Sequence, residues 1–151
     1  MAHDRLKLDD YLPYLINRIG AALVESYTRR ALAAHKLTID MWRVLAALSN
    51  NGGQRQIDLA DVTSIEASTV SRLVTRLVRL GLVTRGRSET SNREVQVQLS
   101  PKGRALVKKL IPVALGLEET ASAGISAADL AQLKKTLRKV YANLSGARAG
   151  D

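Results

Sequence analysis

ASTVSRLVTRLVRLGLV, residues 67–83, is the stretch that decides the fold of this chain. Within it, apolar residues recur at steps of three and four, which places them on one face of a helix from about Ala67 to Leu80. That stripe consists of Val70, Leu73, Val74, Leu77 and Leu80. Gly81 follows, at the position where a left-handed residue commonly ends a helix. The pattern predicts an amphipathic helix that is held to a protein core by its apolar side.

The opposite face of this helix carries short hydroxyl side chains and long guanidinium side chains. An arginine can bond the O6 and N7 edge of guanine, and hydroxyl groups can bond bases or phosphates. The face therefore predicts a recognition helix that enters the major groove of DNA. Its candidate DNA contacts are Ser68, Thr69, Ser71, Arg72, Thr75 and Arg76.

The segments on either side of residues 67–80 extend this pattern to a winged helix-turn-helix. A short helix is expected at 56–63 with Leu59 and Ala60 inward, followed by a turn at Ser64. After Gly81, residues 82–85 and the alternating residues 93–99 predict a β-hairpin with a long polar tip at 86–92. Helix, turn, helix and hairpin together form the DNA-binding part, which we place at 38–100.

Helices are also expected at 10–35 and 38–49, from Pro101 through an apolar stripe that reaches Leu117, and from Ser126 through a stripe that reaches Leu144. Thr38, Ser100 with Pro101, and Ser126 with Asp129 supply their starting signals. Pro112 should kink the helix that contains it. The last helix is expected to bury Leu130, Leu133, Leu137, Val140 and Leu144.

The expected fold is therefore mainly α: one chain, 1–151, with a winged helix-turn-helix core of four helices and a hairpin. A lone winged helix cannot cover the stripes of the flanking helices. We therefore assign 10–35 and 101–145 to a dimerisation body, which makes the protein a homodimer.

The distribution of charge supports a nucleic acid partner. The chain has a formal net charge of +9, and the segment from Ser68 to Lys109 holds ten basic residues against two acidic ones, or +8. A positive face on the recognition helix and the hairpin is what phosphate binding needs. Arg85, Arg87 and Arg93 on the hairpin join the candidate DNA contacts.

The same composition argues against other classes of function. There is no cysteine, which excludes disulfides, thiolate metal sites and thiol-based peroxide sensing. Two histidines, His3 and His35, and no phosphate-binding loop or nucleophile motif leave no basis for an enzyme, a metal or a cofactor. No signal peptide or membrane span is apparent, so we expect a cytoplasmic protein without a membrane partner.

Several motifs together resemble the MarR family of transcription regulators. They are Leu59-Ala60, the run from Ser68 to Leu77, Gly81-Leu82-Val83, Arg93 and Leu99-Ser100-Pro101-Lys102-Gly103. The resemblance implies a triangular homodimer, a recognition helix in the major groove, and Arg93 as the wing arginine that enters the minor groove. One departure concerns the wing: Ser91 stands where the family usually has an acid, and Glu89 is a possible substitute.

The resemblance also implies a small-molecule effector, such as an aromatic acid, a phenol or an acyl-CoA thioester. Candidate pocket residues are Tyr11, Tyr14, Arg18, Trp42 and Arg43. Arg18 or Arg43 can pair a carboxylate, whereas the sequence favours Trp42 and Tyr14 as core residues over pocket residues.

The predicted function is a repressor that binds a pseudo-palindromic site in double-stranded DNA and responds to an effector. The alternative is an architectural DNA-binding protein that responds to no effector.

Overall fold

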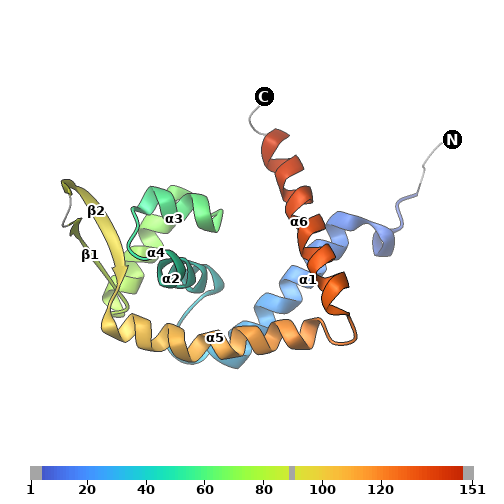
Figure 1. Cartoon of the computed structure of the whole chain (residues 1–151), viewed down its shortest axis with the longest axis horizontal. Helices are drawn as coiled ribbons and strands as arrows, with labels where there is room; N and C mark the ends of the chain where they lie inside the picture. Colours follow the sequence, from blue (N-terminus) through green and yellow to red (C-terminus); the bar gives the residue numbers. More distant parts are fainter. Residues whose placement is uncertain (1–4, 89–90, 148–151) are drawn as a thin grey trace. The chain divides into compact units, whose positions relative to one another are not determined.

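The computed structural model describes residues 5–88 and 91–147, and the side chains of 88, 91–93 and 147 lie outside the description. The elements follow one another along the chain as drawn in Figure 1. They are η1 (Leu8–Asp10), α1 (Leu12–Tyr27), a π-helical turn η2 (Thr28–Leu32), η3 (Ala33–His35), α2 (Ile39–Asn51), α3 (Gln56–Thr63), α4 (Ala67–Arg79), β1 (Val83–Ser88), β2 (Ser91–Leu99), α5 (Pro101–Ala121) and α6 (Ala127–Ala147). Two compact units result, residues 1–117 and 118–151.

The hydrophobic core lies in the first unit. All 21 buried apolar residues of the described chain fall between Tyr27 and Leu110. Leu45 of α2, Leu59 of α3 and Leu77 of α4 have no exposed surface. These three helices therefore form the predicted helix-turn-helix, and the predicted inward residues of α3 and α4 are confirmed, apart from half-buried Leu80.

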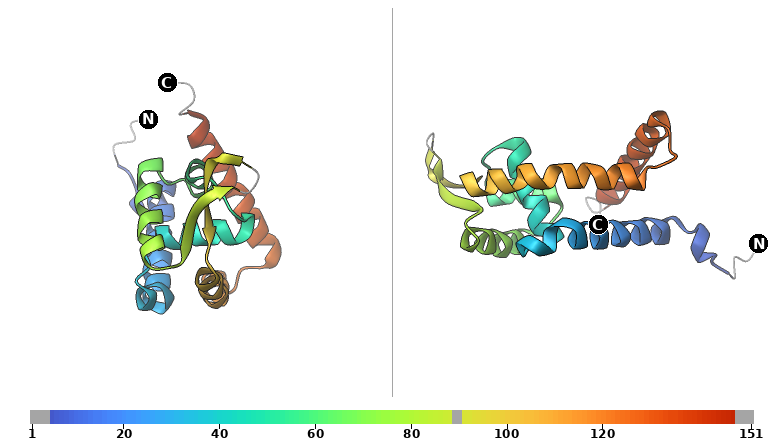
Figure 2. Two further views of the ribbon diagram at one scale, coloured as in Figure 1. Left: turned by 90° about the vertical axis from the view of Figure 1, so that its left-hand side faces the viewer. Right: turned by 90° about the horizontal axis from the view of Figure 1, so that it is seen from below.

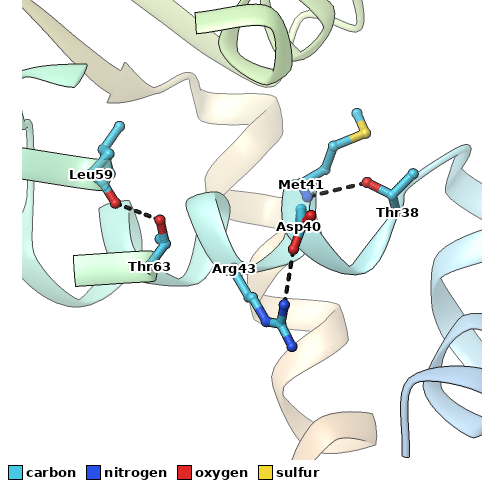
Figure 3. Close-up of polar contacts among 6 residues, drawn as sticks. All are labelled: Thr38, Asp40, Met41, Arg43, Leu59 and Thr63. Atoms are coloured by element: carbon cyan, nitrogen blue, oxygen red, sulfur yellow. Dashed lines mark hydrogen bonds and ion pairs between the residues drawn. The ribbon is translucent and has the colours of Figure 1, made fainter. Parts of the chain in front are cut away.

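The predicted signals at helix ends are confirmed. Thr38 Oγ1 accepts a hydrogen bond from the backbone N–H of Met41 at the start of α2 (Figure 3). Ser64 lies in the left-handed region with φ 58°, between α3 and α4. Gly81 has φ 74°, a value that costs glycine nothing, and ends the turn after α4.

The hairpin is longer than its sequence predicts. β1 and β2 pair antiparallel from Val83 opposite Leu99 to Arg87 opposite Val95, with an irregularity after Arg87. Figure 2 shows the two strands side by side. The expected polar tip at 86–92 is wrong, because polar side chains on an exposed hairpin do not prevent the backbone from pairing. Glu89 and Thr90 lie outside the described residues.

A close contact joins the hairpin to the start of α5. Ser100 Oγ accepts from the N–H of Gly103 at 3.0 Å and donates to the carbonyl of Gly81 at 2.6 Å. A Cβ at Gly103 would lie 2.0 Å from the carbonyl oxygen of Leu82. Position 103 therefore accepts only glycine without movement of the backbone, which explains this glycine of the motif.

The expected single helix at 10–35 begins later, at Leu12, because Tyr11 is extended. It is also not uniform, because the π-helical turn η2 and the 3-10 turn η3 follow α1. Directly before η2, the buried Tyr27 donates its hydroxyl to the carbonyl of Leu110 in α5 at 3.2 Å. Its ring meets Trp42 edge-on with centroids 5.5 Å apart. Burial raises the pKa of Tyr27 to about 12.

Helix α5 continues through Pro112 as one helix.

The second unit contains α6, which begins where Ser126 Oγ accepts from the N–H of Asp129. Its predicted apolar stripe is not buried within this unit: Leu133, Leu137 and Leu144 are 45%, 40% and 67% exposed, and Leu130 and Val140 are half-buried. Periodicity predicts which side of a helix is apolar, but it does not say whether the same chain covers that side. No helix of the described residues is long and apolar enough to cross a membrane.

Candidate nucleic-acid interface

The outer face of α4 is polar and basic, as predicted. Ser68, Arg72, Arg76 and Arg79 are exposed, while the hydroxyl residues Thr69, Ser71 and Thr75 are half-buried beside them. On the inner side, Val70, Leu73, Val74 and Leu77 are at most 8% exposed and fix the helix to the core. The two faces thus leave the guanidinium groups free to approach a ligand while the backbone stays in place.

Local bonds orient several of these side chains. Arg72 Nη2 donates to Thr69 Oγ1 at 3.2 Å, one turn earlier on the helix. Thr75 Oγ1 donates to the carbonyl of Ser71 at 3.0 Å. A shallow hollow of about 270 Å³ lies over this face, lined by Ser71, Arg72, Thr75, Arg76 and Arg79.

A second hollow of about 190 Å³ adds a residue that the sequence did not reveal. Lys36 lines it together with Arg76, Arg79 and Leu80. Lys36 lies between η3 and α2 in the left-handed region, with φ 58°, which is uncommon for a residue other than glycine. No periodicity connects residue 36 with α4, so only the fold reveals this cluster of three cations.

The hairpin arginines differ in their surroundings. Both Arg85 and Arg87 are exposed, but the Arg85 guanidinium bonds to residues of α3 and α4. The backbone of Arg93 lies in β2, but its side chain is outside the description, as are those of Ser91 and Glu89.

An ion pair network lies at the start of α3. Arg55 binds both carboxylate oxygens of Asp58, at 2.9 and 3.0 Å, and lies 3.7 Å from Glu94 of β2. The hydrogen bond to Asp58 is the main cause of the raised pKa of Arg55, and the same bond lowers the pKa of Asp58. The network ties β2 to α3.

The effector candidates are spread over α1, α2 and the residue before α1. Tyr11 and Arg18 are exposed, and Tyr14 is half-buried. Trp42 packs against the buried Tyr27, which agrees with its interpretation as a core residue rather than a pocket residue. Arg43 pairs with Asp40 at 2.9 Å (Figure 3), and neither hollow at α4 is lined by any of the five candidates.

The described residues contain no group of three or more acidic, histidine or cysteine side chains that could hold a metal ion. The face of α4 presents instead guanidinium, ammonium and hydroxyl groups. This set of groups binds anions and base edges.

Comparison with known proteins identifies the family. A model of the MarR family matches residues 35–94. The crystal structure of a MarR family transcriptional regulator from Silicibacter pomeroyi is 31% identical and has a TM-score of 0.78, covering 91% of this chain and 92% of that one. The chain belongs to the MarR family.

As a MarR-family protein, the chain is a DNA-binding transcriptional regulator with a winged helix fold. The HTH-type transcriptional repressor IacR of Pseudomonas putida is 25% identical over 143 residues, which are 95% of this chain and 85% of IacR. Bordetella bronchiseptica BpsR, whose DNA binding is regulated by 6-hydroxynicotinic acid, is 26% identical. Its TM-score is 0.81, with 91% of this chain and 97% of that chain covered.

Proposed function

We propose that this MarR-family regulator is a homodimeric repressor that binds a pseudo-palindromic site in double-stranded DNA. The observation that carries the proposal is the face of α4, where exposed guanidiniums stand beside oriented hydroxyl groups on a helix that is locked to the core. Major-groove reading needs such a helix, because its backbone must stay fixed while its side chains reach base edges.

Within α4, Arg76 and Arg72 are the proposed base readers. Ser68, Thr69, Ser71 and Thr75 bond bases or phosphates from the same face. A bidentate arginine at guanine typically supplies about 1–3 kcal/mol of discrimination against the wrong base.

The hairpin is the proposed wing. Arg87 and Arg93 are assigned to the minor groove and its phosphates, where a narrow A·T groove attracts arginine through its negative potential. Ser91 stands where the family usually has an acid, which leaves Glu89 as the proposed acidic partner of the wing arginine.

The dimer is supported by apolar surface that the single chain leaves open. α6 exposes Leu133, Leu137 and Leu144, and α5 exposes Ile111 and Leu115. Near the N-terminus, α1 exposes Leu12, Ile16 and Ile19. Exposed apolar side chains that recur on one helix after another are typical of an interface. In the proposed assignment, 10–35 and 101–145 form the dimer body and 38–100 binds DNA.

The dimer fixes the geometry of the DNA site. Two recognition helices related by a two-fold axis meet successive major grooves, so the half-sites lie about one helical turn, roughly 10 base pairs, apart.

A small aromatic acid is the proposed effector. BpsR, one of the relatives above, responds to 6-hydroxynicotinic acid. Tyr11, Tyr14, Arg18, Trp42 and Arg43 remain the proposed lining, in which Arg18 or Arg43 pairs the carboxylate. For Arg43 this requires exchange of its present partner, Asp40.

The test is selection of duplexes from a random-sequence pool by the full chain, followed by titration with 6-hydroxynicotinic acid and other aromatic acids. The proposal expects a symmetric consensus and a lower affinity when an acid is added. A thermal-shift series identifies the acid, because a ligand that prefers the folded dimer raises its melting temperature. An asymmetric consensus contradicts the proposed site, and a consensus that no acid weakens points to the effector-independent architectural role.

A further inference from the structure

Three consecutive residues at the start of α3 each bond to the hairpin. Gln54 exchanges two backbone hydrogen bonds with Val97, at 3.0 and 2.7 Å. Arg55 pairs with Glu94, and the Gln56 side-chain carbonyl accepts from Arg85 Nε at 3.2 Å. The segment 54–56 therefore touches both strands of the hairpin.

Arg85 extends this connection to α4. Its Nη2 donates to the carbonyl of Ser71 at 3.0 Å and to Thr75 Oγ1 at 3.0 Å. The hydroxyl of Thr75 donates its one hydrogen bond to the carbonyl of Ser71, so its oxygen accepts the bond from Arg85 with a lone pair. One planar group thus joins β1, α3 and α4 through three neutral oxygen atoms.

We propose that Arg85 is a positioning residue that sets the angle between the wing and the recognition helix and does not bind phosphate. A guanidinium presents its donors in a rigid fork, so acceptors on two helices hold the strand in one orientation. A wing that is ordered before DNA arrives avoids part of the entropy cost of binding. The inference rests on the proposed DNA-binding role of α4 and the wing, and it reassigns one of the predicted DNA contacts.

Arg87 is the matched control. It is two residues further along β1, so it lies on the same side of the strand as Arg85. Like Arg85 it is exposed, but its guanidinium makes no hydrogen bond to another described side chain or carbonyl, whereas Arg85 makes three. The two arginines therefore share charge, strand and side, and differ in whether the guanidinium is bonded to other described residues.

The experiment measures the affinity of Arg85→Gln and Arg87→Gln for the duplex that the wild-type chain selects, across a salt series. The slope of log K against log salt concentration is negative, and loss of a phosphate contact makes it less steep by about 0.9. Arg87→Gln is expected to show that change. Arg85→Gln is expected to weaken binding about tenfold, comparable to loss of hydrogen bonds to a charged group, with an unchanged slope.

Lysine replacements sharpen the distinction. A lysine keeps the charge but cannot span three acceptors. We therefore expect Arg87→Lys to recover most of the affinity lost in Arg87→Gln, and Arg85→Lys to recover little. Melting temperatures of all four variants show that each is folded.

Gln56→Met removes the bond between Arg85 and Gln56 from its other side, without changing the charge of the protein. If Arg85 acts partly through Gln56, the loss in the double variant with Arg85→Gln is smaller than the sum of the two single losses. Hydrogen exchange of the β1–β2 amides in the free protein should rise in Arg85→Gln and not in Arg87→Gln.

The exchange measurement needs no DNA, so it separates the two claims. If the wild-type chain selects no duplex, the proposed function fails while the exchange result still tests Arg85. A salt slope reduced in Arg85→Gln as in Arg87→Gln, rescue by Arg85→Lys, strictly additive losses, or unchanged exchange would each overturn the positioning role.

Discussion

Helices α4 and α6 both carry apolar stripes with steps of three and four residues, but of these two only α4 has its stripe buried within its own compact unit. Leu73 and Leu77 of α4 are 8% and 0% exposed, whereas Leu133 and Leu137 of α6 are 45% and 40% exposed. Burying a leucine side chain contributes about 1.5–3 kcal/mol, so an uncovered stripe leaves a large stabilisation unused. The difference indicates that the helix-turn-helix buries its own apolar residues, whereas the apolar stripe of α6 needs a further surface to cover it.

The largest expected effect is loss of the dimer when α6 becomes charged. Leu133→Glu combined with Leu137→Glu places two carboxylates per chain where the account expects an apolar interface, and burying unpaired charges is strongly unfavourable. Sedimentation should show a monomer at micromolar concentration and much weaker binding of the selected duplex. Gln132→Glu, one position away on α6, is the control and should remain dimeric; a dimeric double variant would refute the assignment.

The next comparison replaces one leucine in each region. Leu45→Ala empties a fully buried position and should lower the free energy of unfolding by about 2–5 kcal/mol at any protein concentration. Leu137→Ala should have an effect that depends on protein concentration, because its contacts form only in the dimer. Urea denaturation at two concentrations measures both. If the loss of unfolding free energy depended on protein concentration in the same way for both variants, α6 could not be distinguished from the core as an interface.

Gly103→Ala tests the contact between the hairpin and α5. The new Cβ would meet the carbonyl of Leu82 at 2.0 Å, and overpacking of this kind costs about 1–3 kcal/mol. Gly116→Ala in the same helix is the control: its Cβ has no atom within 4 Å, and alanine in a helix is favoured by about 0.5–1 kcal/mol. Thermal melts should therefore move in opposite directions, and two shifts of the same sign would contradict the contact.

Arg76→Ala tests the reading role of α4. It should weaken the selected duplex by about 1–3 kcal/mol and scrambled duplexes much less, because it removes a base contact. Arg93→Ala should weaken both more evenly. Binding to the two duplexes across a salt series measures the ratio. A specificity ratio that survives Arg76→Ala but collapses in Arg93→Ala would reverse the roles of helix and wing.

The smallest expected effect concerns Tyr27, which joins α1 to α5. Tyr27→Phe removes its bond to the Leu110 carbonyl and should cost about 0.5–1.5 kcal/mol. Burial raises the pKa of Tyr27 from 10.0 to about 12, so the wild type loses stability as the pH rises through this range. The variant should lack that part of the loss. Equal pH dependence in both proteins would show that Tyr27 does not titrate in this way.

Sequence periodicity predicted most of the fold, because local patterns determine local elements. Thr38, Gly81 and Ser100 mark helix ends through interactions with neighbouring residues, and each was predicted correctly. The length of the hairpin was not predicted, because the polar side chains at 86–88 do not indicate that the backbone there pairs with the other strand. The partners of Arg85 and the neighbours of Lys36 lie 10 to 44 positions away along the chain, so no local pattern could reveal them.

The most direct test of the central claim is a hydroxyl-radical footprint of the full chain on its selected duplex, together with the mass of the complex. The account predicts two chains on one duplex, with two protected patches related by a two-fold axis and about one helical turn, roughly 10 base pairs, apart. One chain on the duplex, or a single protected patch without symmetry, would contradict it.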